Sequence, residues 1–332
     1  MTYPEYKLHF LSVGDADCMV ISYRSSDLTE RKIAVIDAGN VSESQKIKDF
    51  LWDNYRTRKI DLAICTHPDK DHKGGFFGLM EDRQMTIVDF WYKDPCSVLY
   101  LNDFEKGTTK DEAIRICHSI FNHPTDNSKN LIDLANRKCT GTVKSVGEGD
   151  CHTDIPITVM GPSEDYYREV AIDMLNDFKE IEDEADFEDY DETALPNDDD
   201  AKSVIDEDDD TSATNRSSLI LLFNPGRRFL LLGDATCASI KEAMKHHDLT
   251  KCTIKVPHHG SKHNLTTEII DELDIVQSVI SAKGSKKHPS SAIVHWLSKY
   301  GNVYSTHKSG ELFYHSENTS GGEATPLRSK HS

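Results

Sequence analysis

A buried strand that leads directly into a cluster of metal-binding side chains constrains the fold of this 332-residue chain more than any other feature. The apolar run from Ile60 to Cys65 predicts a short buried strand. Four potential metal ligands then fall within six positions, namely His67, Asp69, Asp71 and His72, and Gly74-Gly75 follows them. Because alternate residues of an extended segment point the same way, the first three are predicted to converge while the fourth reaches a neighbouring point. The pattern therefore predicts a loop that serves two adjacent metal ions.

The donor types indicate what such a metal does. Imidazole and carboxylate ligands without thiolate suit Zn, Mn or Fe, and they are common where a metal carries out chemistry rather than stabilises a fold. The alternative interpretation is a polar turn after a buried strand that happens to contain two histidines. Four potential ligands in six positions favour the metal site.

These residues resemble a known signature. His67-Pro68-Asp69-Lys70-Asp71-His72 resembles the His-x-[His/Asp]-x-Asp-His motif of the metallo-β-lactamase superfamily. Aspartate in the second ligand position is similar to the domain of ComEC-type DNA-uptake proteins and their stand-alone relatives. The resemblance implies an α/β (α+β) fold, the αββα sandwich of two facing mixed sheets, with the metals at one edge. A single domain of this kind is expected to span residues 1–315.

Other segments also carry the resemblance, among them His258-His259-Gly260-Ser261 at the end of a predicted strand. Val13 to Asp17 is a turn between two predicted strands and resembles the entry loop of these domains, in which Gly14 and Asp17 match. Asp17 either hydrogen-bonds loop backbone near the metals or caps the turn. Asp37-Ala38-Gly39 ends a buried strand and resembles the next landmark of the superfamily. Gly233-Asp234 ends another predicted strand and resembles the family's Leu-Gly-Asp element.

The same resemblance implies the ligands of two divalent metal ions, Zn or Mn: His67 and Asp69 for the first, Asp71 and His72 for the second, Asp234 as a bridge, and His259 or His258 on the second. A carboxylate such as that of Asp234 can bridge because each oxygen can bind one ion. His259 is favoured over His258 because it directly precedes Gly260. The other histidine then contacts the substrate, and Asp71 also orients the attacking water.

Four basic residues are candidates for substrate contact. His288-Pro289 resembles the closing His-Pro of the family, so His288 is expected over the site, where imidazole can hold a phosphate or protonate a leaving group. Lys262, Lys286 and Lys287 are candidates to neutralise phosphates. The alternatives are a surface loop for His288 and solvent-facing positions for the three lysines.

One position departs from the family pattern. The strand predicted from Ile155 ends near Gly161, where related sequences often carry another histidine ligand. Two interpretations follow. Either one metal ion lacks that ligand, or a histidine from elsewhere replaces it, the candidates being His118, His123 and His152.

Acidic residues are concentrated in one segment. Residues 177–210 contain 18 Asp and Glu against two Lys, which accounts for −16 of the net charge of −19. The rest of the chain is nearly neutral, so the charge does not exclude a nucleic-acid or nucleotide substrate. Because residues 179–214 are also poor in apolar side chains, they are predicted to form a disordered insertion. The alternatives are a regulatory lid that imitates a polyanion and a docking site for a basic protein partner.

The remaining structural predictions concern shorter segments. A helix is expected to begin at Phe76, after the metal-binding loop. Residues 302–305 and 311–314 are predicted to pair as a hairpin. Residues 316–332, rich in Ser, Gly and Glu, are predicted to form a loose tail.

Composition also predicts the cellular location. There is no run of about 18 apolar residues, and the N-terminus has no basic segment followed by an apolar one. Neither a membrane span nor a secretory signal is therefore predicted. Eight cysteines are scattered without a Cys-x-x-Cys pair, which predicts reduced thiols in a cytoplasmic protein.

Together these features predict a metal-dependent hydrolase. The leading hypothesis is a phosphodiesterase or nuclease that cleaves DNA or RNA with water activated by two metal ions about 3.5–4 Å apart. One alternative is hydrolysis of a small molecule, such as a cyclic nucleotide or another phosphoester, on the same metals. Another is a catalytically weakened metal-binding regulatory module. β-Lactam hydrolysis is disfavoured because no secretion signal is seen and the second ligand position is Asp69.

Overall fold

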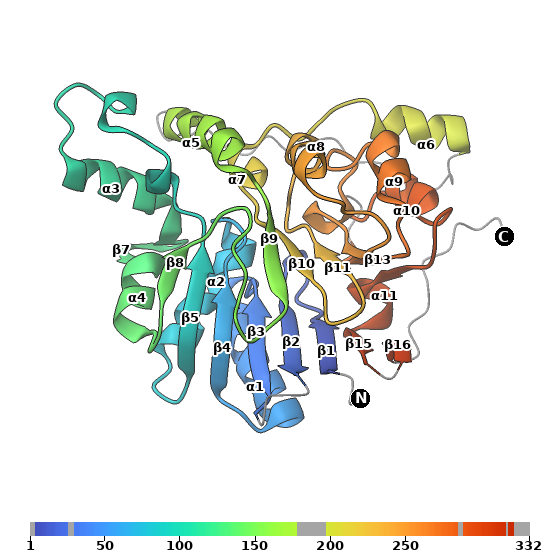
Figure 1. Cartoon of the computed structure of the whole chain (residues 1–332), viewed down its shortest axis with the longest axis horizontal. Helices are drawn as coiled ribbons and strands as arrows, with labels where there is room; N and C mark the ends of the chain where they lie inside the picture. Colours follow the sequence, from blue (N-terminus) through green and yellow to red (C-terminus); the bar gives the residue numbers. More distant parts are fainter. Residues whose placement is uncertain (1–3, 26–29, 178–196, 285–287, 317, 322–332) are drawn as a thin grey trace.

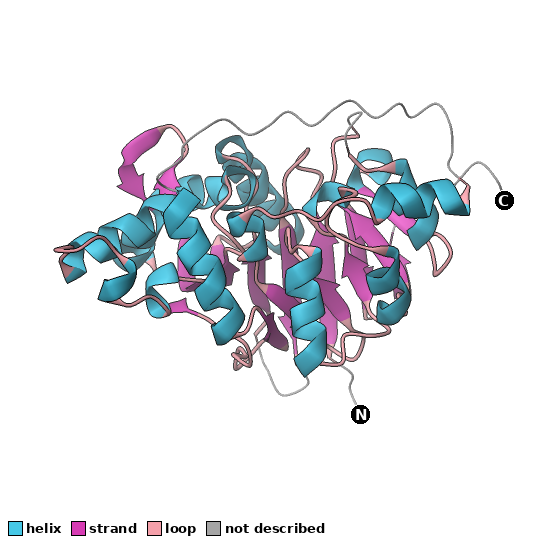
Figure 2. Ribbon diagram, turned by 90° about the horizontal axis from the view of Figure 1, so that it is seen from above, coloured by secondary structure: helices cyan, strands magenta, loops and turns pink. Residues whose placement is uncertain are grey.

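Two β-sheets, covered by helices, organise the computed structural model, which describes residues 4–25, 30–177, 197–284, 288–316 and 318–321 (Figures 1 and 2). The protein is therefore mixed α/β, with mixed sheets, as predicted. Every helix in these ranges is too short or too polar to cross a membrane. All eight cysteines are free thiols.

The larger sheet has eight strands in the order β16-β15-β1-β2-β3-β4-β5-β8. Strands β1 to β3 pair in antiparallel fashion, whereas β3, β4, β5 and β8 are parallel. Its strands are β1 (Glu5–Phe10), β2 (Met19–Arg24), β3 (Lys32–Ile36), β4 (Lys59–Ile64), β5 (Thr86–Tyr92), β8 (Val143–Ser145), β15 (Leu312–His315) and β16 (Asn318–Gly321).

The smaller sheet has six strands in the order β14-β13-β12-β11-β10-β9. Strands β9 to β11 are antiparallel, and β11 to β14 are parallel. Its strands are β9 (Ile157–Gly161), β10 (Ile220–Phe223), β11 (Phe229–Leu231), β12 (Thr253–Lys255), β13 (Gln277–Ile280) and β14 (Val303–Ser305). A separate short hairpin is formed by β6 (Asn122–His123) and β7 (Asp126–Asn130).

Three apolar clusters show how the layers pack. One cluster joins the facing sides of the two sheets, with Leu8 and Leu62 from the larger and Leu221 and Leu231 from the smaller. A second lies between the larger sheet and α1 (Ser44–Tyr55), α2 (Lys70–Glu81) and α4 (Leu131–Lys138). The third lies between the smaller sheet and α8 (Cys237–His246), α9 (Thr267–Leu273) and α10 (Ser291–Leu297). Burial of apolar surface on both faces of each sheet holds these four layers together.

Helix α2 begins earlier than predicted. It starts at Lys70 and not at Phe76, so Asp71 and His72 lie in its first turn and not in an extended segment. The chain is therefore extended only as far as Asp69, the residue before the helix, and side chains alternate only up to that point. The close packing of this helix on the loop after β3 requires Gly74 and Gly75, because a Cβ at either position would collide with the backbone of residues 38–41.

Replacing Gly75 with alanine is expected to destabilise the metal-free protein by about 2 kcal/mol, because its Cβ would press on the Ala38 carbonyl and overpacking is costly. Urea unfolding measures this change. Gly147→Ala is the control, since its Cβ would meet only the flexible end of Lys93. Equal midpoints for the two variants would contradict the close contact between α2 and the loop after β3.

The acidic segment is partly ordered, contrary to the prediction. Residues 197–214 contain α6 (Asp198–Ile205) and the start of α7 (Ala213–Arg216), so the predicted disorder of 179–214 is wrong for this part. Helix α6 packs against α10, with Ala201 and Ile205 buried (Figure 1). Its Asp198 bonds to His295 and Lys299. The part of the prediction that concerns residues 179–196 lies outside the described residues.

Two predictions near the C-terminus are also corrected. Residues 303–305 and 312–315 do not pair as a hairpin, because β14 belongs to the smaller sheet and β15 pairs with β1 in the larger one. Residues 318–321 are not a loose tail but form β16, which pairs with β15. Residues 322–332 lie outside the described ranges. The remaining helices are α3 (Lys110–His118), α5 (Glu164–Asp177) and α11 (Thr306–Ser309).

Candidate metal centre

Four potential ligands meet where β4, β11 and β12 end. One ligand atom from each of Asp71, His72, Asp234 and His259 lies within 4.8 Å of all the others. His72 Nε2 is 3.5 Å from Asp71 Oδ2 and 3.3 Å from Asp234 Oδ2. His259 Nε2 is 3.2 Å from Asp71 Oδ2. The segments that follow these three strands therefore build a group of two imidazoles and two carboxylates.

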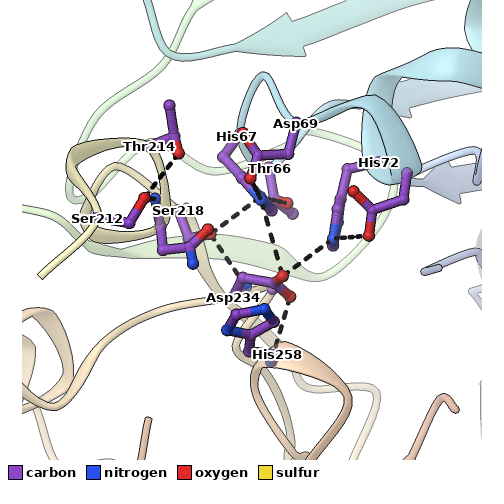
Figure 3. A network of polar contacts seen from close by, with 12 residues as sticks. Thr66, His67, Asp69, His72, Ser212, Thr214, Ser218, Asp234 and His258 are labelled. Atoms are coloured by element: carbon purple, nitrogen blue, oxygen red, sulfur yellow. Dashed lines mark hydrogen bonds and ion pairs between the residues drawn. The ribbon is translucent and has the colours of Figure 1, made fainter. Parts of the chain in front are cut away.

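His67 and Asp69 lie beside this group. His67 Nε2 is 3.6 Å from Asp69 Oδ2 and 3.9 Å from Asp234 Oδ2. Figure 3 shows the rings of His67 and His72 on the same side of Asp234, and their centroids are 4.0 Å apart. The same carboxylate oxygen of Asp234 therefore faces both histidines. The structure differs here from the expectation that each oxygen of Asp234 serves one ion, because Oδ1 faces Lys255 and only Oδ2 is shared between the two positions.

Each of the three histidines has its other ring nitrogen occupied by the protein. His67 Nδ1 lies 3.0 Å from Ser218 Oγ, and His72 Nδ1 lies 2.9 Å from Asp37 Oδ2. His259 Nδ1 donates to the carbonyl oxygen of Ser281 at 2.9 Å. All three rings thus present Nε2 to the centre, which is the way in which metal-bound histidines are commonly oriented.

The Nε2 atoms of His67 and His72 are buried and have no hydrogen-bond partner among the described residues. Buried polar atoms are seldom left in this state, because the loss of hydration is not compensated. A metal ion placed between these nitrogens and the neighbouring carboxylates would satisfy both. The residues present therefore fit a divalent metal.

Asp37 is the main orienting residue that sequence reasoning left without a role. Its carboxylate accepts from the Thr66 backbone N at 2.8 Å and from Thr66 Oγ1 at 2.7 Å, in addition to its contact with His72. It holds the residue before His67 and the ring of His72 at once. The sequence feature that could have indicated this role is the position of Asp37 at the end of a predicted buried strand.

Lys255 is a second residue whose role the sequence did not indicate. Its side chain is fully buried, and Nζ contacts Asp17 and donates to the Gly233 carbonyl at 2.8 Å. It also lies 3.6 Å from Asp234 Oδ1, on the side of that carboxylate away from His72. Burial lowers the pKa of Lys255, but Asp17 and Asp234 more than offset this and raise it. The available signal was a lysine between two apolar residues, Ile254 and Val256, in a predicted strand.

The carboxylates of the centre are held in the charged form. Burial alone would raise the pKa of Asp234, but His72 and Lys255 hold it well below its usual range. The pKa of Asp71 is likewise lowered, against its burial, by His72 and His259. Negative charge concentrated in a buried site favours a divalent cation.

The two adjacent histidines after β12 differ in position. His259 joins the converging group, whereas His258 lies outside it. His258 Nδ1 is 3.1 Å from Asn264 Oδ1, and its backbone N donates to Asp234 Oδ1 at 3.2 Å. Of the two histidines predicted as ligands, His259 therefore lies in the converging group and His258 does not.

Among the other residues predicted to contact substrate, His288 lies beside the centre. Its ring centroid is 5.6 Å from that of His258 and 6.1 Å from that of His259. Burial and these two neighbouring rings lower the pKa of His288 to about 4.

The three lysines predicted to contact substrate are less well placed for comparison. Lys262 is partly exposed, and its Nζ lies 3.9 Å from Glu207. Lys286 and Lys287 lie outside the described residues.

The ligand expected near residue 161 is not replaced by any of the three candidate histidines. A Cβ at Gly161 would contact Ala243 of α8, so this position faces the helical layer. The side chains of the three histidines are engaged elsewhere: His118 with Asp94, His123 with Phe77, and His152 with the backbone of Asp154 and Ile155.

No protein-family model and no curated protein matches this chain. The resemblance based on residues 67–72 therefore stays a prediction.

Proposed function

We propose that this protein is a metal-dependent hydrolase of phosphodiesters, and that its two facing sheets with outer helices form the metallo-β-lactamase αββα sandwich. The observation that carries the proposal is the common orientation of His67, His72 and His259. Each presents Nε2 to the buried carboxylates of the centre while a neighbouring group occupies Nδ1. A polar turn without a metal would not require three such anchored rings around buried carboxylates.

The candidate ligands form two metal positions, one with four protein ligands and one with three. Asp71, His72, His259 and Asp234 would hold one ion. His67 and Asp69, with the shared Asp234, would hold the other. Divalent ions in such a pair lower the pKa of a water and stabilise charge on the attacking and leaving oxygens. The chain's own residues supply the orientation: Asp37, Ser218 and Ser281 fix the three rings, and Lys255 fixes the far oxygen of Asp234.

The difference between the positions predicts two classes of metal affinity. Titration of metal-free protein with Zn or Mn is expected to show one tight and one weak equivalent, because the tight position has one more protein ligand. His67→Ala should remove only the weak equivalent, and His259→Ala should remove the tight one. A single class in wild type, or loss of the same class in both variants, would contradict the assignment.

Two substrate classes are candidates for this function, DNA or RNA and a small phosphodiester, and the position of the acidic segment favours the small one. The ordered residues Glu207 and Asp210 lie next to Lys262 and His258, at the side of the centre. Carboxylates in this place oppose the approach of a long polyanion such as DNA or RNA. They repel a cyclic nucleotide or another short phosphodiester less strongly, because it carries fewer phosphates.

The test is metal-dependent hydrolysis of bis-p-nitrophenyl phosphate, single-stranded DNA and cyclic dinucleotides, in Zn and in Mn. Wild type is compared with Asp71→Ala, which removes a carboxylate that faces His72 and His259. Turnover that is lost in the variant supports the hydrolase, and the preferred substrate separates the two candidates. Full metal loading with no turnover above that of Asp71→Ala would refute the enzyme and indicate a metal-binding regulatory module.

A further inference from the structure

The ordered end of the acidic segment is fastened to the loops that carry the metal centre. We call residues 206–210 the acidic strap. Asp206 accepts from the backbone N and the Oγ1 of Thr267, both at 2.8 Å, at the start of α9. Asp209 accepts from the Cys237 backbone N at 3.2 Å, at the start of α8. The Asp210 backbone N donates to the His263 carbonyl at 2.9 Å. The strap therefore connects the segment after Asp234 with the segment after the two histidines.

Asp210 points its carboxylate inward from this strap. Its side chain is 12% exposed, and Oδ2 lies 3.3 Å from His258 Nδ1. The same oxygen accepts from Asn215 Nδ2 at 2.7 Å and from Asn264 Nδ2 at 3.0 Å. Oδ1 accepts from the Ser212 backbone N at 2.9 Å. With so many donors, the carboxylate has little freedom to turn, and its position beside His258 is well determined.

Asn264 completes the support of His258. Its Oδ1 lies 3.1 Å from His258 Nδ1, while its Nδ2 also donates to the Asp234 carbonyl at 3.2 Å. The backbone of His258 and His259 has φ of 46° and 54°, values that non-glycine residues adopt only when their surroundings hold them there. The surrounding contacts therefore stabilise an uncommon backbone conformation as well as a ring orientation.

One ring nitrogen of His258 remains for a ligand. Nδ1 is occupied by Asn264 and Asp210, and no hydrogen-bond partner of Nε2 is found among the described residues. The side chain is 33% exposed, and its ring centroid is 5.9 Å from that of His259, a residue of the converging group. His258 thus lies next to the centre, on its solvent side. Figure 3 shows it below Asp234.

We propose that Asp210 is a positioning residue, whose carboxylate pairs with the His258 imidazolium and fixes its ring so that Nε2–H donates a hydrogen bond to a phosphoryl oxygen of a phosphodiester at the metal centre. This inference rests on the proposed function and adds the acidic strap to its substrate site. It gives the acidic insertion a role that neither disorder nor a solvated loop would supply.

Kinetics with bis-p-nitrophenyl phosphate test the coupling of the two residues. Asp210→Asn and His258→Ala are each expected to lower kcat/KM about tenfold, as for loss of one hydrogen bond to a charged group. The double variant should be no worse than His258→Ala alone, because Asp210 acts only through that ring. Metal content should be unchanged in all three. Asp199→Asn, which removes an exposed charge on α6, is the matched control and should behave as wild type.

Two kinetic outcomes would overturn the inference. If the losses from Asp210→Asn and His258→Ala multiply in the double variant, the two residues act independently. If Asp210→Asn lowers metal content together with turnover, the strap supports the ligands and not His258.

A second readout does not require turnover. In a ring-¹⁵N NMR spectrum of the metal-free protein, Asp210→Asn should shift the Nδ1 signal of His258 and leave that of His118 unchanged. An unchanged His258 signal would refute the positioning role. If the signal shifts but wild type cleaves no phosphodiester, the proposed function and the substrate contact fail, while the contact between Asp210 and His258 stands.

Discussion

Replacing Asp234 with asparagine is expected to abolish phosphodiester hydrolysis, with a fall of about 10³-fold or more, because several kcal/mol of transition-state stabilisation depend on the metals. Asp234 is the carboxylate that faces both His67 and His72, so its loss weakens both metal positions at once. Asparagine keeps the shape and an acceptor for the His258 backbone N but removes the charge. Metal content by mass spectrometry should fall from two equivalents to fewer than one.

The control for this prediction is again Asp199→Asn, which removes the same charge from an exposed position on α6. The melting temperature of metal-free Asp234→Asn shows whether the fold is retained. Retained turnover together with full metal loading would refute the bridging role of Asp234. A loss of only one equivalent would assign it to a single position.

Replacing Lys255 with methionine is expected to destabilise the metal-free protein by about 3–5 kcal/mol, the cost of removing one partner of a buried ion pair. Methionine fills a similar volume, but Asp17 and Asp234 are then buried without their cation. Urea unfolding in the presence of a chelator measures the change. Added metal should restore part of the stability, because the ion again balances the charge of Asp234.

Two further variants separate charge from packing at Lys255. Asp17→Asn in the Lys255→Met background should recover part of the loss, since it removes one of the two uncompensated carboxylates. Lys241→Met breaks an exposed pair with Glu268 and should change stability by less than about 1 kcal/mol. If Lys255→Met were as mild as Lys241→Met, the buried ion pairs would not contribute to stability in the way we infer.

The metal-binding loop was predictable because its information is local. The loop with His67, Asp69, Asp71 and His72 follows a short buried strand, β4, which lies between β3 and β5 in the larger sheet. The preference for His259 over His258 also came from a local feature, the glycine that follows. Convergence of these residues with Asp234 was expected only through the family resemblance, since nothing in the spacing of residues 72, 234 and 259 brings them together.

Strand pairing near the C-terminus shows why local pattern fails at longer range. Residues 303–305 and 312–315 are strands, as predicted, and the short connection suggested a hairpin. The structure instead pairs β14 with β13 at the edge of the smaller sheet, and places β15 between β1 and β16 in the larger one. Leu312 and Tyr314 are then buried between the two sheets. Which sheet each strand joins depends on where the other strands of the two sheets lie, and most of these are distant in the sequence.

The acidic segment shows that composition also fails to predict contacts between distant segments. Its charge predicted disorder, because few apolar side chains are present to offset chain entropy. In residues 197–214, two apolar residues, Ala201 and Ile205, are buried in a helix that packs on α10, and Asp206, Asp209 and Asp210 bond to other segments. Composition gives the number of charges in a segment, but it does not show which hydrogen-bond donors other elements place beside them.

The sequence by itself determined the donor chemistry of this protein, the loop that carries most of it, and the alternation of strands and helices, because each depends on residue type and near neighbours. Only the tertiary structure decided that Asp37, Ser218 and Ser281 turn three histidines toward the buried carboxylates, that Lys255 lies buried behind Asp234, and that Asp210 reaches His258. These contacts join segments far apart in the chain, and they arise only when both sheets are packed.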